Sequence, residues 1–180
     1  MAVIAAIAAL SAWLGASVIV LGEGSRGIAA GVGCATLGLA VIAWQSTGFV
    51  PALAIFVGGA VVALQYQRSD GRTWGIMPAG STPRLILCVA TGLVALWIAA
   101  SVTLGPGVAQ RFAVLVVVGL TAGRILTTQQ IQVVMAAAAV LALAVAEGAG
   151  FGTQSVWPYV AAGLIAIGVT LVPIKEPSVT

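Results

Sequence analysis

Residues 1–21 read MAVIAAIAALSAWLGASVIVL and carry no charged side chain. The run is as long as the roughly twenty apolar residues that a helix needs to cross the hydrocarbon core of a bilayer. It lacks the positively charged first segment of a cleaved secretory signal, so it is predicted to be the first membrane span. Similar apolar runs follow along the chain. The predicted spans are 2–21, 27–45, 49–66, 84–104, 108–126, 128–146 and 157–174.

The composition matches this pattern, because 61% of the 180 residues are hydrophobic and only 6% are charged. Soluble proteins carry roughly a quarter charged residues. A lipid environment requires every backbone hydrogen bond to be closed internally, which a helix does within one segment. A transmembrane barrel would show shorter stretches of alternating apolar and polar residues. The sequence therefore predicts an all-α, polytopic integral membrane helical bundle of about seven transmembrane helices, forming a single transmembrane domain over residues 1–180 with the lipid bilayer as its main partner.

The charges predict an orientation. The net charge is +3, but the basic side chains form no patch of the kind that binds nucleic acid. Cytoplasmic loops of membrane proteins collect Lys and Arg. Seven spans place Arg111 on one side of the membrane and six basic residues on the other: Arg26, Arg68, Arg72, Arg84, Arg124 and Lys175. This bias predicts a multi-pass protein of a cell membrane, such as the bacterial inner membrane, with its N-terminus outside and its C-terminus in the cytoplasm.

Two connections bear on the helix count and on partners. The segment from Gln45 to Gly48 carries no charge, so one long bent helix over 27–66 is an alternative to two spans. A helix of about forty residues at 1.5 Å per residue would be about twice as long as the membrane is thick, which favours two spans. The polar segment 67–83 is predicted to be a cytoplasmic loop between the two halves. It would serve either as a solvated linker or as a contact surface for a partner.

The two halves of the chain share a local pattern. A helix from Ile28 is followed by the polar residues 45–48 and by a helix with Pro51 near its start. A helix from Ile131 is followed by the polar residues 152–155 and by a helix with Pro158 near its start. Proline is tolerated in a first helical turn, where its missing N–H has no intrahelical partner. The pattern predicts a parallel three-plus-one-plus-three repeat.

Few residues could carry chemistry. Arg124 and Glu147 come closest to burial but are expected at helix ends, where Arg can extend to the headgroups and water screens both charges. The alternative is a paired or ligand-binding role. Gln132 is expected to donate a hydrogen bond across a helix interface. With no histidine in the chain and with Cys34 and Cys88 inside apolar runs, neither a metal site nor a disulfide is predicted. No cofactor site is predicted either, and the sparse inventory of acid, base and nucleophile argues against an enzyme.

Glycine and tryptophan predict how the helices pack and where they end. Gly27 and Gly31 have the spacing of a GxxxG motif, with Gly33 close by, and Gly58 and Gly59 form a second small patch. Small residues of this kind let helices approach closely in lipid, so these glycines are candidate packing positions. The tryptophans are expected mostly near span ends, as interfacial anchors. They are Trp13, Trp44, Trp74, Trp97 and Trp157.

Two stretches carry a family resemblance. Residues 48–64 read GFVPALAIFVGGAVVAL and resemble the third helix of the J-type membrane subunit of respiratory complex I. Residues 118–122 read VGLTA and, with the two spans that follow, resemble the start of the neighbouring K-type subunit. The K-type pattern carries mid-membrane glutamates for proton transfer, whereas residues 135–139 of this chain read MAAAA. The resemblance therefore implies a scaffold or lateral spacer that lacks this relay.

Two functional hypotheses follow. The first is a non-catalytic structural or accessory subunit of a multisubunit membrane complex, concerned with ion translocation or electron transfer and in contact with other membrane subunits. Short loops and small-residue faces favour it. The alternative is a compact small-solute transporter or channel, in which two three-helix repeats enclose a binding site. Copurification of stoichiometric partners would favour the first hypothesis, and transport by the isolated chain in liposomes would favour the second.

Overall fold

A computed structural model describes residues 2–68, 82–102, 107–150 and 155–171. Seven helices are found in this part of the chain. They are α1 (Ala2–Leu21), α2 (Ser25–Ser46), α3 (Phe49–Arg68), α4 (Thr82–Val102), α5 (Val108–Thr127), α6 (Ile131–Ala149) and α7 (Trp157–Leu171). Six of them are long and apolar enough to cross a membrane, and α7 is a shorter apolar helix. The protein is a multi-pass membrane protein with an all-α fold, as the sequence predicts.

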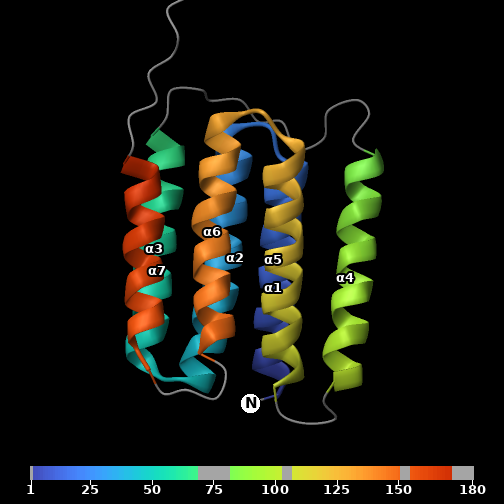
Figure 1. The fold of residues 1–180 in the computed structure, drawn as a ribbon, viewed down its shortest axis with the longest axis vertical. Coiled ribbons are helices and arrows are strands. Elements are labelled where there is room, and N and C mark those ends of the chain that lie inside the picture. Colours follow the sequence, from blue (N-terminus) through green and yellow to red (C-terminus); the bar gives the residue numbers. More distant parts are fainter. Residues whose placement is uncertain (1, 69–81, 103–106, 151–154, 172–180) are drawn as a thin grey trace, which may run out of the picture.

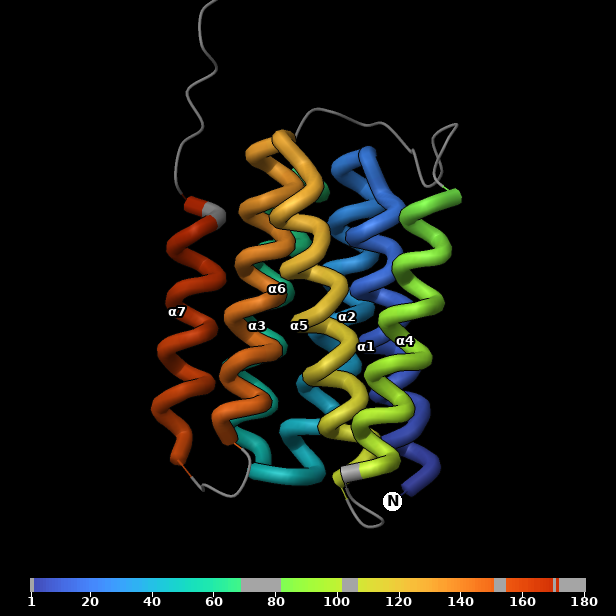
Figure 2. Tube along the Cα trace, turned by 45° about the vertical axis from the view of Figure 1, so that its right-hand side comes forward, coloured from blue at the N-terminus to red at the C-terminus, as the bar shows by residue number. Residues whose placement is uncertain are grey.

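The helices form two layers of three (Figure 1). One layer contains α1, α2 and α3, and the other contains α5, α6 and α7. Each helix of the first layer contacts its counterpart in the second, so that α1 lies against α5, α2 against α6 and α3 against α7. The two helices of each such pair run in the same direction (Figure 1). Figure 2 shows α4 at one edge of the bundle, where it contacts α1 and α5. This is the predicted three-plus-one-plus-three arrangement.

The connection between α2 and α3 breaks the chain into two helices. The backbone N–H groups of Thr47 and Gly48 both donate to the carbonyl oxygen of Ala43, at 2.8 and 3.0 Å. Gly48 has a φ of +109°, a conformation that favours glycine because it has no Cβ. Pro51 then lies in the first turn of α3. These features exclude the single bent helix over 27–66.

The closest helix contact joins α1 and α2 through small residues. Gly31 leaves so little space that an added Cβ would lie 2.8 Å from Ile19 Cγ1 and 2.9 Å from the Gly15 carbonyl oxygen. One turn and two turns further on, Ala35 and Gly38 continue the same face of α2. A Cβ on Gly38 would lie 2.6 Å from the backbone nitrogen of Ala12. The two backbones therefore touch along most of the hairpin.

The other candidate glycines differ in their surroundings. Gly27 is buried in α2. A Cβ on Gly58 would lie 3.2 Å from the Cα of Gly163 in α7, and one on Gly59 would overlap the side chain of Thr36. Gly33, in contrast, has space for a side chain, because an added Cβ would meet no described atom within 4 Å. The contact face of α2 therefore runs through Gly31 and Gly38 and leaves Gly33 to one side.

Helix α4 is held to the bundle by one narrow face. Its buried positions fall at the helical spacing of Cys88, Gly92, Ala95 and Ala99. The indole Nε1 of Trp13 donates to the Cys88 carbonyl oxygen at 3.3 Å and packs over Gly92. Trp13 lies in the middle of α1, so it connects two helices and is no interfacial anchor. Trp44, Trp97 and Trp157 are exposed near helix ends, and Trp74 lies outside the described residues.

The charged residues divide the bundle into two ends. Arg26, Arg68, Arg84 and Arg124 lie at the end where α1, α3 and α5 finish, which we call the basic end. Arg111 and Glu147 lie near the opposite end, which we call the Glu147 end. Arg72, Lys175 and most of the 67–83 segment fall outside the described residues. The described arginines therefore follow the segregation that the seven-span count requires.

A bulky residue at the α1–α2 contact should destabilise the protein. Gly38→Leu is expected to lower the free energy of unfolding by about 1–3 kcal/mol or more, because the side chain must separate two touching backbones. Gly33→Leu on the same helix is the matched control, and its open surroundings should leave stability unchanged or slightly raised. Thermal unfolding of the purified protein in detergent measures both. Equal midpoints for the two variants would contradict the packing argument.

Candidate functional site

The most deeply buried charged-type side chain of the described residues is the carboxyl group of Glu147, near the end of α6, with 0% of its surface exposed. Its Oε1 atom accepts a hydrogen bond from Gln110 Nε2 at 2.7 Å and lies 3.3 Å from Ser46 Oγ, whose single proton is shared between this oxygen and the Ile42 carbonyl oxygen at 3.0 Å. Ser46 ends α2 and Gln110 lies in the first turn of α5. The alternating direction of the helices brings these three turns to the same end, so the cluster draws on both layers of the bundle.

The carboxyl group of Glu147 has no basic partner in the described part of the chain. The ion pair found there joins Arg84 Nη1 and Glu23 Oε1 at 2.8 Å, at the basic end. Glu147 Oε2 is buried and makes no hydrogen bond with a described residue. The buried hydroxyl of Tyr159, from α7, lies beside the same carboxyl group and beside the side chain of Thr47. Buried polar atoms are rarely left unpaired, so Oε2 requires its own proton or a donor beside it, and the Tyr159 hydroxyl is the described group placed to donate.

Space for the Tyr159 ring is made by a glycine. Tyr159 is fully buried, and a Cβ on Gly150 would collide with its hydroxyl group. Gly150 directly follows the last residue of α6. The end of α6 therefore serves two purposes, since it carries Glu147 and leaves room for the hydroxyl that lies beside it.

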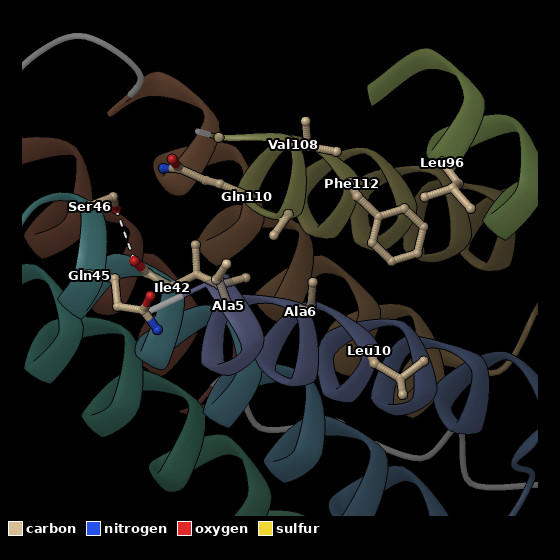
Figure 3. Close-up of a pocket in the computed structure, with 14 residues that line it drawn as sticks. Ala5, Ala6, Leu10, Ile42, Gln45, Ser46, Leu96, Val108, Gln110 and Phe112 are labelled. Atoms are coloured by element: carbon tan, nitrogen blue, oxygen red, sulfur yellow. Dashed lines mark hydrogen bonds between the residues drawn. The ribbon is translucent and has the colours of Figure 1, made fainter. Parts of the chain in front are cut away.

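A cavity of about 900 Å³ lies next to this cluster, between α1, α2, α4 and α5 (Figure 3). Ser46 and Gln110 line it and also bond Glu147, so one layer of side chains separates the cavity from the carboxyl group. The volume is within the range of roughly 300–1,000 Å³ that is common for small-molecule sites. The lining residues are Ala2, Ala5, Ala6, Ala9, Leu10, Ile42, Gln45, Ser46, Leu96, Gly107, Val108, Ala109, Gln110 and Phe112.

The chemistry available to this site is proton or cation exchange at a carboxyl group. An ionised carboxylate is costly in a water-poor interior unless it is paired, and in membrane spans such residues mark proton relays and transport sites. Oε1 accepts the Gln110 hydrogen bond and lies within reach of the Ser46 hydroxyl, whereas Oε2 is open to a proton. Ser46 and Gln110 can transmit a change at Oε1 to the cavity, because each lies beside Glu147 and also lines the cavity wall.

The sequence-based expectation for Arg124 and Glu147 requires a correction. Both lie near helix ends as expected, but neither is screened by water, because Arg124 is only 2% exposed and Glu147 is not exposed at all. Arg124 Nη2 donates to the Gly22 carbonyl oxygen at 3.4 Å, and its Nε has no hydrogen-bond partner among the described residues. Helix packing around the last turn of α5 encloses the guanidinium group. The two residues lie at opposite ends of the bundle and do not form one site.

Gln132 makes its helix contact through the backbone. Its carbonyl oxygen accepts a hydrogen bond from the hydroxyl of Tyr66 in α3, while its own side chain is exposed. The expected side-chain donation across a helix interface is therefore replaced by acceptance at the main chain. Tyr66 is largely buried, so this bond ties α3 to the first turn of α6.

The cysteines and acidic residues form no metal site in the described ranges. No group of three His, Cys, Asp or Glu residues is close enough to hold an ion there. Cys34 and Cys88 are both free thiols, and Cys34 Sγ lies 3.3 Å from Ser11 Oγ.

Sequence patterns missed three members of the Glu147 cluster. Ser46 appeared only as part of a polar connection, and Gln110 and Tyr159 had no distinguishing pattern. Each is a single polar residue in an apolar helix end, and only the packing of four helices brings them together. The useful signal was Glu147 itself, because an acidic residue within a membrane span marks a functional position by default.

Comparison with known proteins gives no family, since no family model, curated protein or solved structure matches this chain.

The hydrogen bond from Gln110 to Glu147 should contribute measurably to stability. Glu147→Leu is expected to lower the free energy of unfolding by about 1–3 kcal/mol, because the Gln110 amide loses its acceptor. Glu147→Gln keeps an oxygen in place and should stay close to the parent. Adding Gln110→Leu to Glu147→Leu should recover part of the loss, since both partners are then apolar. Thermal unfolding in detergent tests the series, and additive losses in the double variant would refute the pairing.

Proposed function

We propose that this protein is a compact membrane transporter of a small solute, with Glu147 as the ionisable group of the transport site. The observation that carries the proposal is a fully buried carboxyl group, without a basic partner in the described residues, whose polar neighbours Gln110 and Ser46 also line a cavity. A transporter needs a group that changes its protonation or its partner as solute binds. Glu147 is placed to make that change and to pass it to Ser46 and Gln110.

The position of the site relative to the two triplets supports the same function. Ser46 belongs to the first triplet, α1 to α3, while Gln110 and Glu147 belong to the second, α5 to α7. Transporters built from repeats bind their substrates where the repeats meet and move one repeat against the other. A proton or cation at Glu147 would change the bonds that join the triplets. The cavity lies toward the Glu147 end. This position fits the state of an alternating-access cycle in which the binding site is open to that side of the membrane.

A second candidate is the accessory subunit of a multisubunit membrane complex. The supporting observation is α4, which buries only one narrow face and exposes large apolar side chains such as Leu93 and Trp97. This apolar face could be covered by another membrane subunit instead of by lipid. The resemblance to the J-type and K-type subunits of respiratory complex I belongs to this candidate. Glu147 lies near the end of α6, away from the residues 135–139 in which that resemblance lacks a carboxylate.

The proposed location is a cell membrane, with the Glu147 end outside and the basic end in the cytoplasm. The N-terminus would then be external and the C-terminus cytoplasmic. Four of the five described arginines at one end support this orientation through the positive-inside rule.

Labelling of introduced cysteines tests the orientation. In a background with Cys34 and Cys88 replaced by Ala, Ser155→Cys should react from outside intact cells with a membrane-impermeant maleimide. Gln130→Cys should react only after permeabilisation. Both positions are exposed and flank α6 at opposite ends, so they form a matched pair. Reversed accessibility would overturn the orientation, and labelling of both from one side would overturn the membrane crossing by α6.

Transport should depend on the Glu147 carboxyl group. Proteoliposomes that hold the purified chain and a pH-sensitive dye are expected to show a dye response when a transported solute from a panel of small molecules is added. Glu147→Gln should abolish the response while its thermal midpoint stays near the parent's. Glu23→Gln, at the exposed ion pair of the basic end, should retain it. Copurification with stoichiometric partners, together with no flux for any solute, would instead favour the accessory subunit.

A further inference from the structure

The cavity beside Glu147 has an uncharged lining of two kinds. Its polar groups are the Gln45 and Gln110 amides and the Ser46 hydroxyl, whereas alanines and larger apolar side chains make up most of the remaining wall. Figure 3 shows Gln45, Ser46 and Gln110 on one side of the space and Leu10, Phe112 and Leu96 on the other. The lining is therefore amphipathic, with a polar side and an apolar side.

No charged side chain lines the cavity among the described residues. An ionic ligand would have to leave water or the headgroup region without a direct counter-charge, which is costly in a low-dielectric site. The Gln110 amide uses one N–H on Glu147 and keeps its second N–H and its carbonyl oxygen for another partner. Amide and hydroxyl groups of this kind both donate and accept hydrogen bonds. They suit a neutral headgroup that carries a hydroxyl or carbonyl oxygen.

The cavity is bordered by helix surfaces that face outward from the bundle. Ala2, Ala6 and Leu10 line it from α1 and are exposed, as is Leu96 from α4. Trp13 ties α1 to α4 further toward the basic end. Between Trp13 and the N-terminal residues of α1, the cavity separates the two helices. The exposed residues at this border are apolar, so the border suits a molecule that comes from the bilayer.

From these observations we infer that the cavity binds a neutral amphipathic molecule from the bilayer, with a hydroxyl or carbonyl headgroup near Gln45, Ser46 and Gln110 and a hydrocarbon body against Leu10, Leu96 and Phe112. This inference rests on the proposed transport function for its physiological role, because it names the class of solute moved. Binding at Ser46 and Gln110 would place the headgroup next to the donors of Glu147. Solute and carboxyl group would then be linked through shared hydrogen bonds.

Photolabelling tests the ligand class without any transport step. The probe is a long-chain alcohol with a diazirine on its hydrocarbon chain, added to the purified full-length chain in phosphatidylcholine nanodiscs. Mass spectrometry should locate the cross-links on the N-terminal half of α1 and around Phe112, and unlabelled long-chain alcohol should compete. A diazirine-bearing phosphatidylcholine should label the exposed face of α4 but not the cavity.

A tryptophan that fills the cavity can be compared with a tryptophan placed elsewhere on the same helix. Ala6→Trp, on the cavity wall, should reduce cavity labelling by about tenfold, the change that corresponds to about 1.4 kcal/mol of binding free energy. Val3→Trp, on the same helix but away from the lining, should leave labelling unchanged. Gln45→Leu should weaken competition by the alcohol more than competition by an alkane of equal length. Both Ala6 and Gln45 are exposed, so folding should be unaffected.

Three results would overturn the inference: labelling spread evenly over the lipid-facing helices, equal cavity labelling by the phosphatidylcholine probe, or no effect of Ala6→Trp. Specific labelling without solute-driven flux in proteoliposomes would remove the proposed transport function and leave the ligand class in place. Flux of a polar solute without cavity labelling would support the proposed transport function and overturn the inferred ligand class.

Discussion

The rest of the structure depends on the close approach of α1 and α2 through small side chains. In lipid, apolar surfaces gain little from hiding against each other, so helices associate through dispersion contacts and hydrogen bonds. Gly31 and Gly38, with Ala35 between them, bring the backbone of α2 against Ala12 and Gly15 of α1. Helix α2 is then the shared element of the bundle, because it contacts α1, α3, α5 and α6. Its last residue, Ser46, owes its place beside Glu147 to this packing.

The two charged side chains buried in the described part of the bundle lie at opposite ends of it. Glu147 at one end and Arg124 at the other are both enclosed by helices, and neither has an oppositely charged partner with which it forms a salt bridge among the described residues. A pair of buried opposite charges in contact would neutralise itself and serve mainly to hold the bundle together. Separation along the bundle leaves Glu147 surrounded by neutral donors only. Such a carboxyl group can exchange a proton or respond to a ligand, as the proposed transport function requires.

Helix α4 explains why a cavity exists at this edge. It attaches to the bundle through a stripe of small residues and one indole hydrogen bond, and Gly92 lies directly under Trp13. Beyond that contact, the cavity lies between α1 and α4, and the alanines of α1 that line it have side chains too short to fill the space. The result is an apolar space bounded on one side by the polar ends of α2 and α5. The same loose attachment leaves a broad apolar face of α4 for lipid or for another subunit.

The sequence by itself determined the membrane environment, the helical class and nearly all helix positions. Runs of about twenty apolar residues match the thickness of the hydrocarbon core, and a helix satisfies its backbone hydrogen bonds within one segment. The first helix was predicted at 2–21 and is found at Ala2–Leu21. The break between residues 45 and 48 followed from the length that a single helix over 27–66 would have and from the distribution of basic residues. The site depended on tertiary structure, because Ser46, Gln110 and Tyr159 are ordinary polar residues until four helix ends meet around Glu147. The burial of Arg124 and Glu147 likewise could not be derived from their places near helix ends. Whether a helix end is exposed to solvent depends on which other helices pack against it. Only the packing of α1 against α2, and the looser attachment of α4, decided which ends were enclosed and where the cavity lies.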